Sequence, residues 1–483
     1  MIPMNSYLPK EGIFFYLLKY IIVFISLGGS MTVSAEGLWG TYLKPFSVQS
    51  PWNARPVSPV LDNFEIPRSD YFPTVAQGKY STGVFLASAD DQSMPVLALP
   101  GRRGVWIPDA EEYRQTVEIA HWPAEVLPAS GSDGHADIVD PGLGIVHSFF
   151  QLKNIDGQWR AGQYAWTSIG GRGWGEPGHY FQGARAAAVP SMGGIIRKHE
   201  VDDGEGIYRH ALAASLTFNA LSANPAYVYP ATSADGSAAT TNTGRIPEGA
   251  LLMLPGNFDT LTISNAKLRK VAETLKVYGA YVVDRNVGTP FVIYVENGSD
   301  FNLHGSKWDN AVARDLDRIR AALRQVVKTS GWLDGDGKAM KMDRRLNLLS
   351  MRGAWKLDSG NQAGVYDTWQ QRLMFAPASG PVVQTNYSGR ILNPITWAIP
   401  KSGEVFRLTT HATGGARLRL QLFALKSSQK LFDSGELADE RVVVFNWPAE
   451  QARAVAIAYS GVGGQASSVG GSLVAVGGDE AER

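Results

Sequence analysis

The sequence predicts a mainly β protein: an antiparallel β-sandwich of jelly-roll type with one or two covering helices, followed by a smaller β-sandwich. Short segments that alternate apolar and polar residues recur between turn signals, which is typical of sandwiches and barrels. Glycine (52 residues) is abundant, and aromatic residues make up 10% of the chain. Only two segments have the period of an amphipathic helix. Because 483 residues exceed the usual size of one hydrophobic core, we expect two domains.

The composition describes a folded chain and limits its partners. Hydrophobic residues make up 44% of the sequence and charged residues 19%, a balance that is typical of globular domains. The chain has 45 basic and 45 acidic residues, so its formal net charge is zero. This balance argues against nucleic acid or an anionic membrane surface as the main partner.

Residues 1–35 have the order of a secretory signal peptide. Lys10 and Lys19 precede a short apolar run at residues 20–27, and small residues at 33–35 suit cleavage before Glu36. The apolar run is shorter than the roughly 20 residues of a spanning helix, so we expect no membrane span in the mature chain. The sequence has no cysteine, so its stability must come from a sizeable core. These features predict a bacterial periplasmic or secreted protein.

The main domain is expected at residues 36–350. Its first part, residues 39–73, is rich in proline and aromatic residues and is expected to run extended over the domain surface. Between residues 75 and 260, short strands alternate with turn signals. The DPGLG turn at residues 140–144 is expected to join two of these strands as a hairpin.

Two helices are predicted after these strands. Ser264 can cap a helix that runs to about Tyr278 and ends at Gly279. A second helix is expected at about residues 310–328. In both segments apolar residues recur at helical spacing, so each helix is expected to cover a sheet. Strands are predicted at residues 280–284 and 291–295.

The last part of the chain predicts a small accessory β-sandwich at residues 362–476, after an irregular polar stretch. In residues 417–423 strict alternation turns Leu418, Leu420 and Leu422 to one face, as a half-buried strand requires. Such a module is expected to bind carbohydrate. The alternative is that it only packs against the first domain or mediates assembly.

Titratable residues are concentrated between residues 131 and 212, where five of the 8 histidines lie. His135 and Asp137 share one face of a predicted strand. His147 lies on the paired strand and is expected close to both. Such a group can supply a base, an acid or metal ligands, whereas the alternative is a solvated sheet face. We therefore predict a catalytic role for these three residues.

Four more residues of this window are candidate catalytic groups: Arg185, Arg197, Glu200 and His210. Arginine can neutralise a uronate carboxylate with two hydrogen bonds. For His210 alone, a core histidine bonded to the backbone is an equal alternative.

The candidate substrate-binding residues come from several predicted elements. The glycine-rich loop at residues 170–175 lacks the strand–GxGxxG–helix setting of a phosphate loop, so we expect it to carry Trp174 on an exposed rim. Tyr208 and Tyr281 are candidate proton donors, and Asp284 is a further candidate acid.

No metal or cofactor is predicted. Residues 334–337 begin like a calcium loop, but Lys338 occupies an acidic position and no terminal Glu follows in register. The sequence has no cysteine-based, HExxH or GxSxG motif.

Six segments of the chain together resemble a family of secreted, mostly uncharacterised bacterial proteins. They are DGHADIVDP, GARAAAVPSMGGIIRKHE, GIYRHAL, YPATSADG, RIPEGALLMLP and VYGAYVVDR, and the resemblance covers residues 39–296. This sequence departs from the pattern by placing Tyr208 and Arg209 between Ile207 and His210. The family resembles jelly-roll carbohydrate-active proteins in architecture, so the resemblance implies a fold and export but no particular reaction.

These observations predict an exported enzyme that cleaves a polysaccharide. A lyase acting on an acidic glycan is favoured, because His, Arg and Tyr outnumber acids in the central window. The alternative is a glycoside hydrolase, for which Asp137, Asp140, Glu200 and Asp284 are available as paired carboxylates. The rival from another class is a non-catalytic component that binds a glycan or serves exopolysaccharide handling in the envelope.

Overall fold

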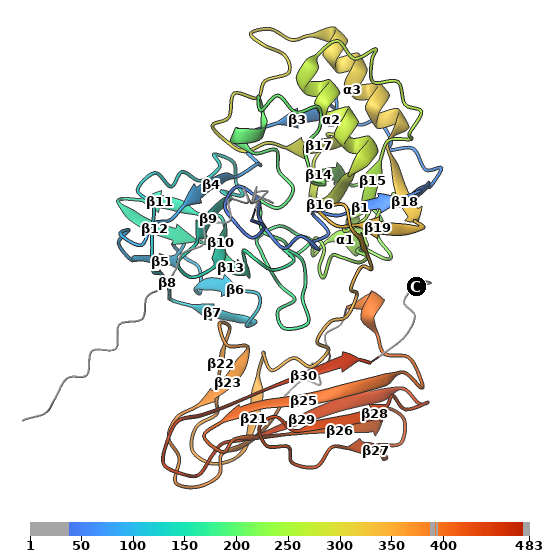
Figure 1. The fold of residues 1–483 in the computed structure, drawn as a ribbon. Coiled ribbons are helices and arrows are strands. Elements are labelled where there is room, and N and C mark those ends of the chain that lie inside the picture. The colour runs from blue at the N-terminus through green and yellow to red at the C-terminus, as the bar shows by residue number, and fades with distance from the viewer. Residues whose placement is uncertain (1–37, 387–391, 393–394, 477–483) are drawn as a thin grey trace, which may run out of the picture. The chain divides into compact units, whose positions relative to one another are not determined.

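Thirty strands and three α-helices make up the regular structure of the described residues, which confirms the predicted mainly β class with β-sandwich sheets (Figure 1). The computed structural model describes residues 38–386, 392 and 395–476. The signal peptide predicted at residues 1–35 lies outside this part of the chain. No helix among the described residues is long and apolar enough to cross a membrane.

Two sheets formed by the N-terminal part of the chain contain strands of the histidine-rich window. In the six-stranded sheet, called the histidine sheet here, the order is β4 (Gly83–Leu86), β9 (Ala136–Asp140), β10 (Ile145–Phe150), β13 (Gln163–Ser168), β6 (Val105–Ile107) and β7 (Glu112–Arg114). The four-stranded sheet has the order β11 (Lys153–Ile155), β12 (Gln158–Ala161), β5 (Met94–Ala98) and β8 (Thr116–Ile119).

A seven-stranded sheet lies under the helices. Its order is β2 (Val60–Leu61), β18 (Arg324–Lys328), β15 (Leu251–Met253), β16 (Ala280–Asn286), β14 (Leu212–Thr217), β17 (Phe291–Tyr294) and β3 (Thr74–Ala76). A small sheet joins β1 (Arg55–Val57), β19 (Gly331–Leu333) and β20 (Ala339–Met340). Several neighbours in these sheets run parallel, including β14 with β16 and β4 with β9.

Two helices cover the seven-stranded sheet, as predicted (Figure 1). Their apolar faces share one buried cluster with alternate residues of β14 and β16. The first, α2 (Ala266–Val277), is capped by the side chain of Asn265 rather than by Ser264, because Asn265 accepts from the Leu268 amide. The second, α3 (Asn310–Ala322), is shorter than expected, since the chain turns extended at Leu323 and enters β18. The remaining helices are short: α1 (Ala238–Thr241), η1 (Lys198–Glu200) and η2 (Thr396–Ala398).

The C-terminal strands form two five-stranded sheets. One has the order β21 (Trp355–Ser359), β24 (Val383–Asn386), β29 (Ala452–Tyr459), β26 (Arg417–Ala424) and β27 (Lys430–Asp433). The other has the order β22 (Val365–Asp367), β23 (Arg372–Phe375), β30 (Ser467–Ala475), β25 (Val405–Thr413) and β28 (Val442–Asn446). Leu418, Leu420 and Leu422 are buried, as the alternation in β26 predicts.

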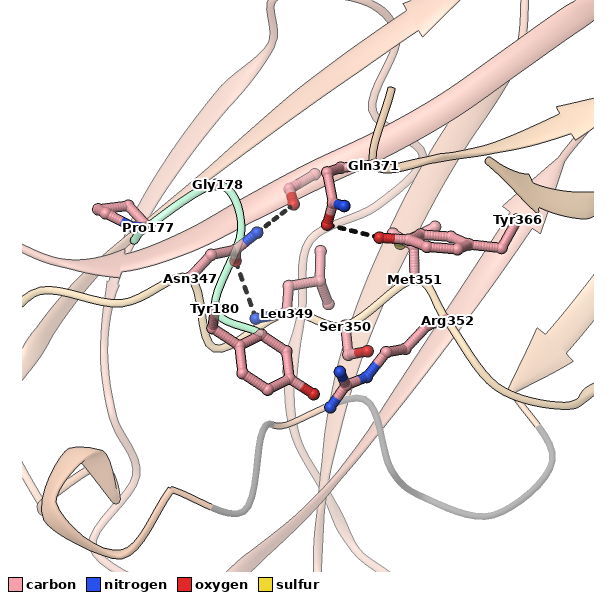
Figure 2. A pocket seen from close by; sticks show the side chains of 11 residues that line it. Pro177, Gly178, Tyr180, Asn347, Leu349, Ser350, Met351, Arg352, Tyr366 and Gln371 are labelled. Carbon is pink, nitrogen blue, oxygen red and sulfur yellow. Dashed lines mark hydrogen bonds between the residues drawn. The ribbon is translucent and has the colours of Figure 1, made fainter. Parts of the chain in front are cut away.

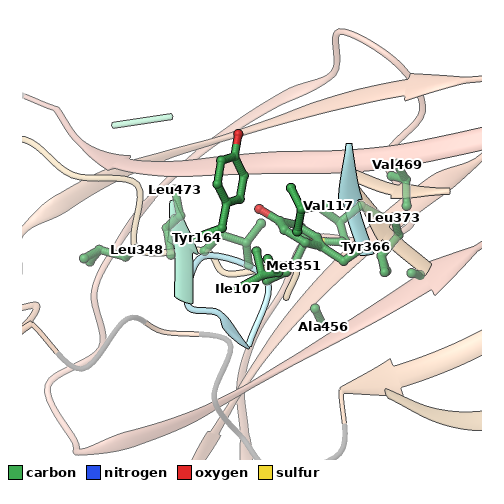
Figure 3. Close-up of a cluster of buried hydrophobic side chains, with 14 of the residues drawn as sticks. Ile107, Val117, Tyr164, Leu348, Met351, Tyr366, Leu373, Ala456, Val469 and Leu473 are labelled. Carbon is green, nitrogen blue, oxygen red and sulfur yellow. The ribbon is translucent and has the colours of Figure 1, made fainter. Parts of the chain in front are cut away.

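One buried cluster joins strands from early and late in the chain. Ile107 and Tyr164 from the histidine sheet belong to the same cluster as Met351, Tyr366 and Leu373 (Figure 3). The described residues from Trp39 onward form one compact unit. The division into a main domain at 36–350 and a module at 362–476 therefore stays a prediction.

The hairpin of β9 and β10 fixes which histidine-window residues share a face. Asp140 pairs with Ile145 across the turn, as predicted. The same register places Asp137 opposite Ser148 and His147 opposite Ile138. Neighbouring residues of a strand point to opposite faces. His147 therefore lies on the other side of the sheet from Asp137, and the expectation that they lie together is wrong.

Candidate active site

Three carboxyl groups and a guanidinium meet beside β16. We call Asp235, Glu248 and Asp284 the carboxyl cluster. Asp284 lies on β16, Glu248 precedes β15, and Asp235 precedes α1. The backbone amide of Asp235 donates to Glu248 Oε1 at 3.1 Å. Arg185, from the loop after β13, donates from Nη1 to Asp284 Oδ2 at 3.2 Å.

The backbone holds Glu248 in place from two sides. Its amide donates to the Ala226 carbonyl at 3.0 Å, and its carbonyl accepts from the Val228 amide at 2.8 Å. The following Gly249 donates to the Val282 carbonyl of β16 at 2.7 Å. Gly249 has φ +84°, and a Cβ there would lie 2.2 Å from the Val228 oxygen. Only glycine fits this close approach, so the Glu-Gly pair of the RIPEGALLMLP segment has a structural reason.

Burial raises the pKa of all three carboxyl groups, and nearby charges add to or oppose the rise. Burial raises the pKa of Glu248 well above its ordinary value, and the charges of Asp235 and Asp284 raise it further. Burial also raises the pKa of Asp284 to about 6, against the opposing charge of Arg185. For Asp235 burial raises the pKa, while Arg285 and a side-chain hydrogen bond with Glu248 oppose the rise. Burial and the two neighbouring charges therefore favour the protonated form of Glu248, which can donate a hydrogen bond to Asp235.

Hydrogen-bonding capacity is left unused around this cluster. Glu248 Oε2, Asp235 Oδ2, Arg185 Nη2 and Arg285 Nη1 are buried, and within the described chain they have no hydrogen-bond partner. The Arg185 and Arg285 nitrogens are hydrogen-bond donors beside the carboxyl cluster. Solvent reaches the cluster through Asp284, whose side chain is 17% exposed.

His135 and Asp137 adjoin the cluster from the histidine sheet. Burial lowers the pKa of His135 well below its ordinary value, and the charge of Arg185 lowers it further. Its Nδ1 lies 3.1 Å from Ser191 Oγ. Asp137 accepts from Ser148 Oγ at 2.7 Å, and burial raises its pKa to about 6. Both side chains are buried, so they are placed to support Arg185 rather than to meet a polymer directly.

His147 belongs to a different group on the opposite face of the sheet. Its Nδ1 lies 2.9 Å from the Tyr164 hydroxyl, and its Nε2 lies 3.9 Å from Asp140 Oδ2. His121 Nδ1 contacts the same Asp140 oxygen at 2.7 Å. Asp140 thus lies between two histidines, away from the carboxyl cluster.

Arg197, Glu200 and His210 form an ion-pair network of their own. Arg197 pairs with Glu296 at 2.8 Å, and its guanidinium lies 4.6 Å above the Tyr42 ring. Glu200 and His210 are 3.2 Å apart. Burial raises the pKa of Glu200, but the attraction and hydrogen bond of His210 outweigh it and lower this pKa to about 2. Two nitrogens of the Arg197 guanidinium are thus bonded within the protein, whereas its Nη2 has no hydrogen-bond partner among the described residues.

Three expected substrate-binding side chains are buried. The expectation that Trp174 lies on an exposed rim is wrong, because its ring is fully buried and stacks on Trp52 at 4.7 Å. Tyr281 meets Trp52 edge-on at 5.5 Å. The ring of Tyr208 lies 4.4 Å from the Lys270 ammonium. Burial raises the pKa of both tyrosines, so each hydroxyl keeps its proton.

The cluster contains two residues that the sequence interpretation missed, Asp235 and Glu248. Both stand before a glycine in segments quoted for the family resemblance, YPATSADG and RIPEGALLMLP. An acidic residue before glycine in a loop-forming segment was the signal available. Among residues 38–386, 392 and 395–476, no group of His, Cys, Asp or Glu is arranged to hold a metal ion.

Comparisons with known proteins add little to this geometry. No family model and no curated protein matches the chain. The chain is similar in part to accessory secretory proteins 1, 2 and 3 of Streptococcus pneumoniae, at 10% identity and TM-score 0.18 over 29% of this chain and 99% of that one. A xylan binding module from Roseburia intestinalis matches at 10% identity and TM-score 0.18, over 29% of this chain and 100% of that one.

A fucose binding module of Streptococcus pneumoniae matches at 9% identity and TM-score 0.17, over 28% of this chain and 98% of that one. Similarity at these TM-scores carries no conclusion about function. The family resemblance drawn from the motifs stays a prediction.

Proposed function

We propose that the protein is an exported enzyme, periplasmic or secreted, that hydrolyses a polysaccharide with the carboxyl cluster as its acid–base centre. The observation that carries the proposal is the Asp235–Glu248 carboxyl pair beside the partly exposed Asp284. Glycoside hydrolysis uses two carboxyl groups that differ in protonation state. Burial raises the pKa of all three carboxyl groups of this cluster, and Arg285 beside Asp235 and Arg185 beside Asp284 oppose the rise.

The chemistry divides roles between the three carboxyl groups. Asp284, with a pKa raised to about 6, is the candidate general acid for the leaving sugar oxygen. Asp235 is the candidate base, because Glu248 and Arg285 both favour its ionised form. Glu248 is fully buried and cannot touch a substrate. It is therefore a positioning residue that holds Asp235 in place and influences the pKa of Asp235.

Hydrolysis is favoured over elimination by what the arginines contact. A lyase needs a free cation to neutralise the substrate carboxylate. The charge of Arg197 is paired with Glu296 and that of Arg185 with Asp284, so neither is free to offset a further carboxylate, although each guanidinium keeps one nitrogen without a partner among the described residues. The two candidate tyrosines are buried in packed aromatic or ionic surroundings. These contacts support the hydrolase alternative more than the lyase.

The test is incubation of the purified chain with a panel of neutral and acidic polysaccharides. We expect new reducing ends without products that absorb in the ultraviolet. The variants D284N and D235N should each lose activity about 100-fold or more, the usual scale for a general acid or base. The matched control is D202N, because Asp202 is 70% exposed and pairs with Lys267 on the surface, so this variant should keep full activity.

Three outcomes would overturn the proposal. Unsaturated, ultraviolet-absorbing products would show an elimination and restore the lyase alternative. Retention on a glycan with no turnover by the wild-type chain would support the non-catalytic binding alternative. Full activity in both D284N and D235N would place the reaction elsewhere in the chain.

A further inference from the structure

A partly exposed tryptophan is stacked on a second tryptophan beside the histidine sheet. Trp369, on the turn between β22 and β23, is 41% exposed. Its ring stacks on Trp166 of β13 with centroids 5.1 Å apart and an interplanar angle of 23°. Large exposed aromatic surface on a folded protein often marks a contact site. The position of this ring therefore calls for an explanation beyond packing.

Polar contacts fix the turn that carries Trp369. The amides of Trp369 and Gln370 donate to Asp367 Oδ1 at 2.7 and 3.1 Å. Gln371 donates from Nε2 to Asp109 Oδ2 at 2.5 Å and accepts from the Tyr366 hydroxyl at 2.5 Å, the second of which Figure 2 shows. The ring is thus held before any ligand arrives. A preorganised side chain loses little conformational entropy on binding.

Other rings surround Trp369 on the side of the sheet. His147 lies edge-on at 6.3 Å and Tyr164 lies tilted at 6.4 Å. We call Trp166, Trp369, His147 and Tyr164 the aromatic platform, in which the buried His147 and Tyr164 support the exposed Trp369 ring. Trp166 covers one face of the Trp369 ring. Because 41% of Trp369 remains exposed beside this stack, part of the ring is available as a flat apolar contact for a ligand.

The charges beside the platform favour an uncharged ligand. Asp140 lies between His121 and His147, and Asp109 lies 3.4 Å from His179. Burial lowers the pKa of His147, so this imidazole is neutral at pH 7. Arg114, whose charge acts on Tyr164, is paired with Glu112 at 2.6 Å. Asp140 and Asp109 are buried, but their negative charges lie near the platform and disfavour an anionic sugar more than a neutral one.

We propose that the aromatic platform binds the apolar face of an uncharged sugar ring in a polysaccharide. Pyranose rings expose flat C–H faces, and aromatic rings offer a complementary flat surface that gains contact area in the same way as aromatic pairs do. The platform is separate from the carboxyl cluster, because His147 and Asp137 point to opposite faces of the β9–β10 hairpin. The inference rests on the proposed glycan substrate but not on its cleavage.

The experiment measures retention of the full chain on insoluble cellulose, chitin and xylan, with soluble alginate as the acidic probe in affinity electrophoresis. We expect binding to at least one neutral polymer. W369A should weaken that binding about tenfold, because a stacked ring contributes about 1.4 kcal/mol. W369F should recover most of the affinity. The matched control is W308A, since Trp308 is also exposed, at 57%, and also stacks on a ring, that of His304.

Each outcome either supports or overturns the proposed aromatic platform. Binding that falls in W369A but not in W308A supports the platform, whether or not the chain cleaves the polymer. Equal binding by W369A and wild type, or retention only by alginate, would overturn it. A failure of the carboxyl cluster is distinguished by D284N, which should keep retention while losing turnover. Circular dichroism of W369A checks that the fold is retained.

Discussion

Asp235 and Glu248, 13 positions apart in the chain, are joined by a hydrogen bond from the amide of one to the carboxyl oxygen of the other. The contact brings a partly exposed carboxyl group next to a fully buried one. Two interacting carboxyl groups titrate as a unit, and the stronger burial of Glu248 favours its protonated form. The pH dependence of stability and of activity should both report this pair.

Replacing Glu248 tests its protonation. Its folded-state pKa is raised, so its contribution to stability is complete below the ordinary Glu pKa of about 4.3 and is lost as the pH rises toward the raised value. E248Q mimics the neutral acid. Relative to wild type, its free energy of unfolding should therefore rise by up to about 1.4 kcal/mol per pH unit above that point.

Urea unfolding at several values between pH 4 and pH 8 checks this difference. E205Q is the control, because Glu205 is half exposed. A difference between E248Q and wild type that does not change with pH would contradict a protonated Glu248.

The pH–rate profile tests the role of Asp284. A general acid must be protonated, so activity should fall as the pH rises through its pKa of about 6. Initial rates of reducing-end release between pH 4 and pH 9 measure this alkaline limb, which D284N should lack. If activity falls only above pH 8, Asp284 is not the general acid.

The Glu200–His210 pair should stabilise the fold over a limited pH window. The pKa of Glu200 is lowered to about 2, so its contribution is present above its ordinary value and is lost as the pH falls toward 2. The pKa of His210 is raised, because attraction to Glu200 outweighs burial, so its contribution is lost as the pH rises through that value. E200Q should therefore cost about 2 kcal/mol of unfolding free energy near pH 5.5 and less at pH 9. Thermal unfolding at both values measures the difference, and an equal loss at both would contradict the pairing.

Trp174 should matter for stability and not for ligand contact. Its ring is buried against Trp52, so W174A should lower the free energy of unfolding by about 3–5 kcal/mol. W369A, at the exposed position, should have a much smaller effect. If W174A keeps the wild-type unfolding temperature and loses only glycan affinity, the ring is not part of the core.

Truncation tests the cluster shared by the early and late strands. A chain that ends at Ser350 loses Met351, Tyr366 and Leu373, which pack in one cluster with Ile107 and Tyr164. We expect this chain to aggregate or to unfold at a lower temperature, because apolar surface is left exposed. Size-exclusion chromatography and circular dichroism measure both. Wild-type thermal stability in the truncated chain would support an independently folding main domain.

The sequence periodicity predicted the helices and strands better than the contacts between them. The helices at α2 and α3 were visible because each has an apolar stripe, and the β9–β10 hairpin because its turn residues are local signals. The face of the sheet on which His147 lies could also have been derived from the sequence. Once Asp140 pairs with Ile145, counting along both strands places His147 opposite Ile138.

The carboxyl cluster depends on contacts that no local pattern contains. Asp235, Glu248 and Asp284 come from two loops and a strand, and a parallel pairing of β16 with β14 helps to set their positions. The sequence identified Asp284 and Arg185 individually but not the residues that they meet. The burial of Trp174 was hidden for the same reason, since its partner Trp52 lies far away in the chain.

The β9–β10 hairpin separates the two proposed sites, because one lies on each face of its strands. Asp137 and Ser148 point toward the carboxyl cluster and Arg185, whereas Asp140 and His147 point toward the aromatic platform. A slip of one residue in the pairing would exchange these two faces together. The proposed polymer binding and the proposed cleavage therefore both depend on this short turn, and an insertion or deletion there should remove both at once.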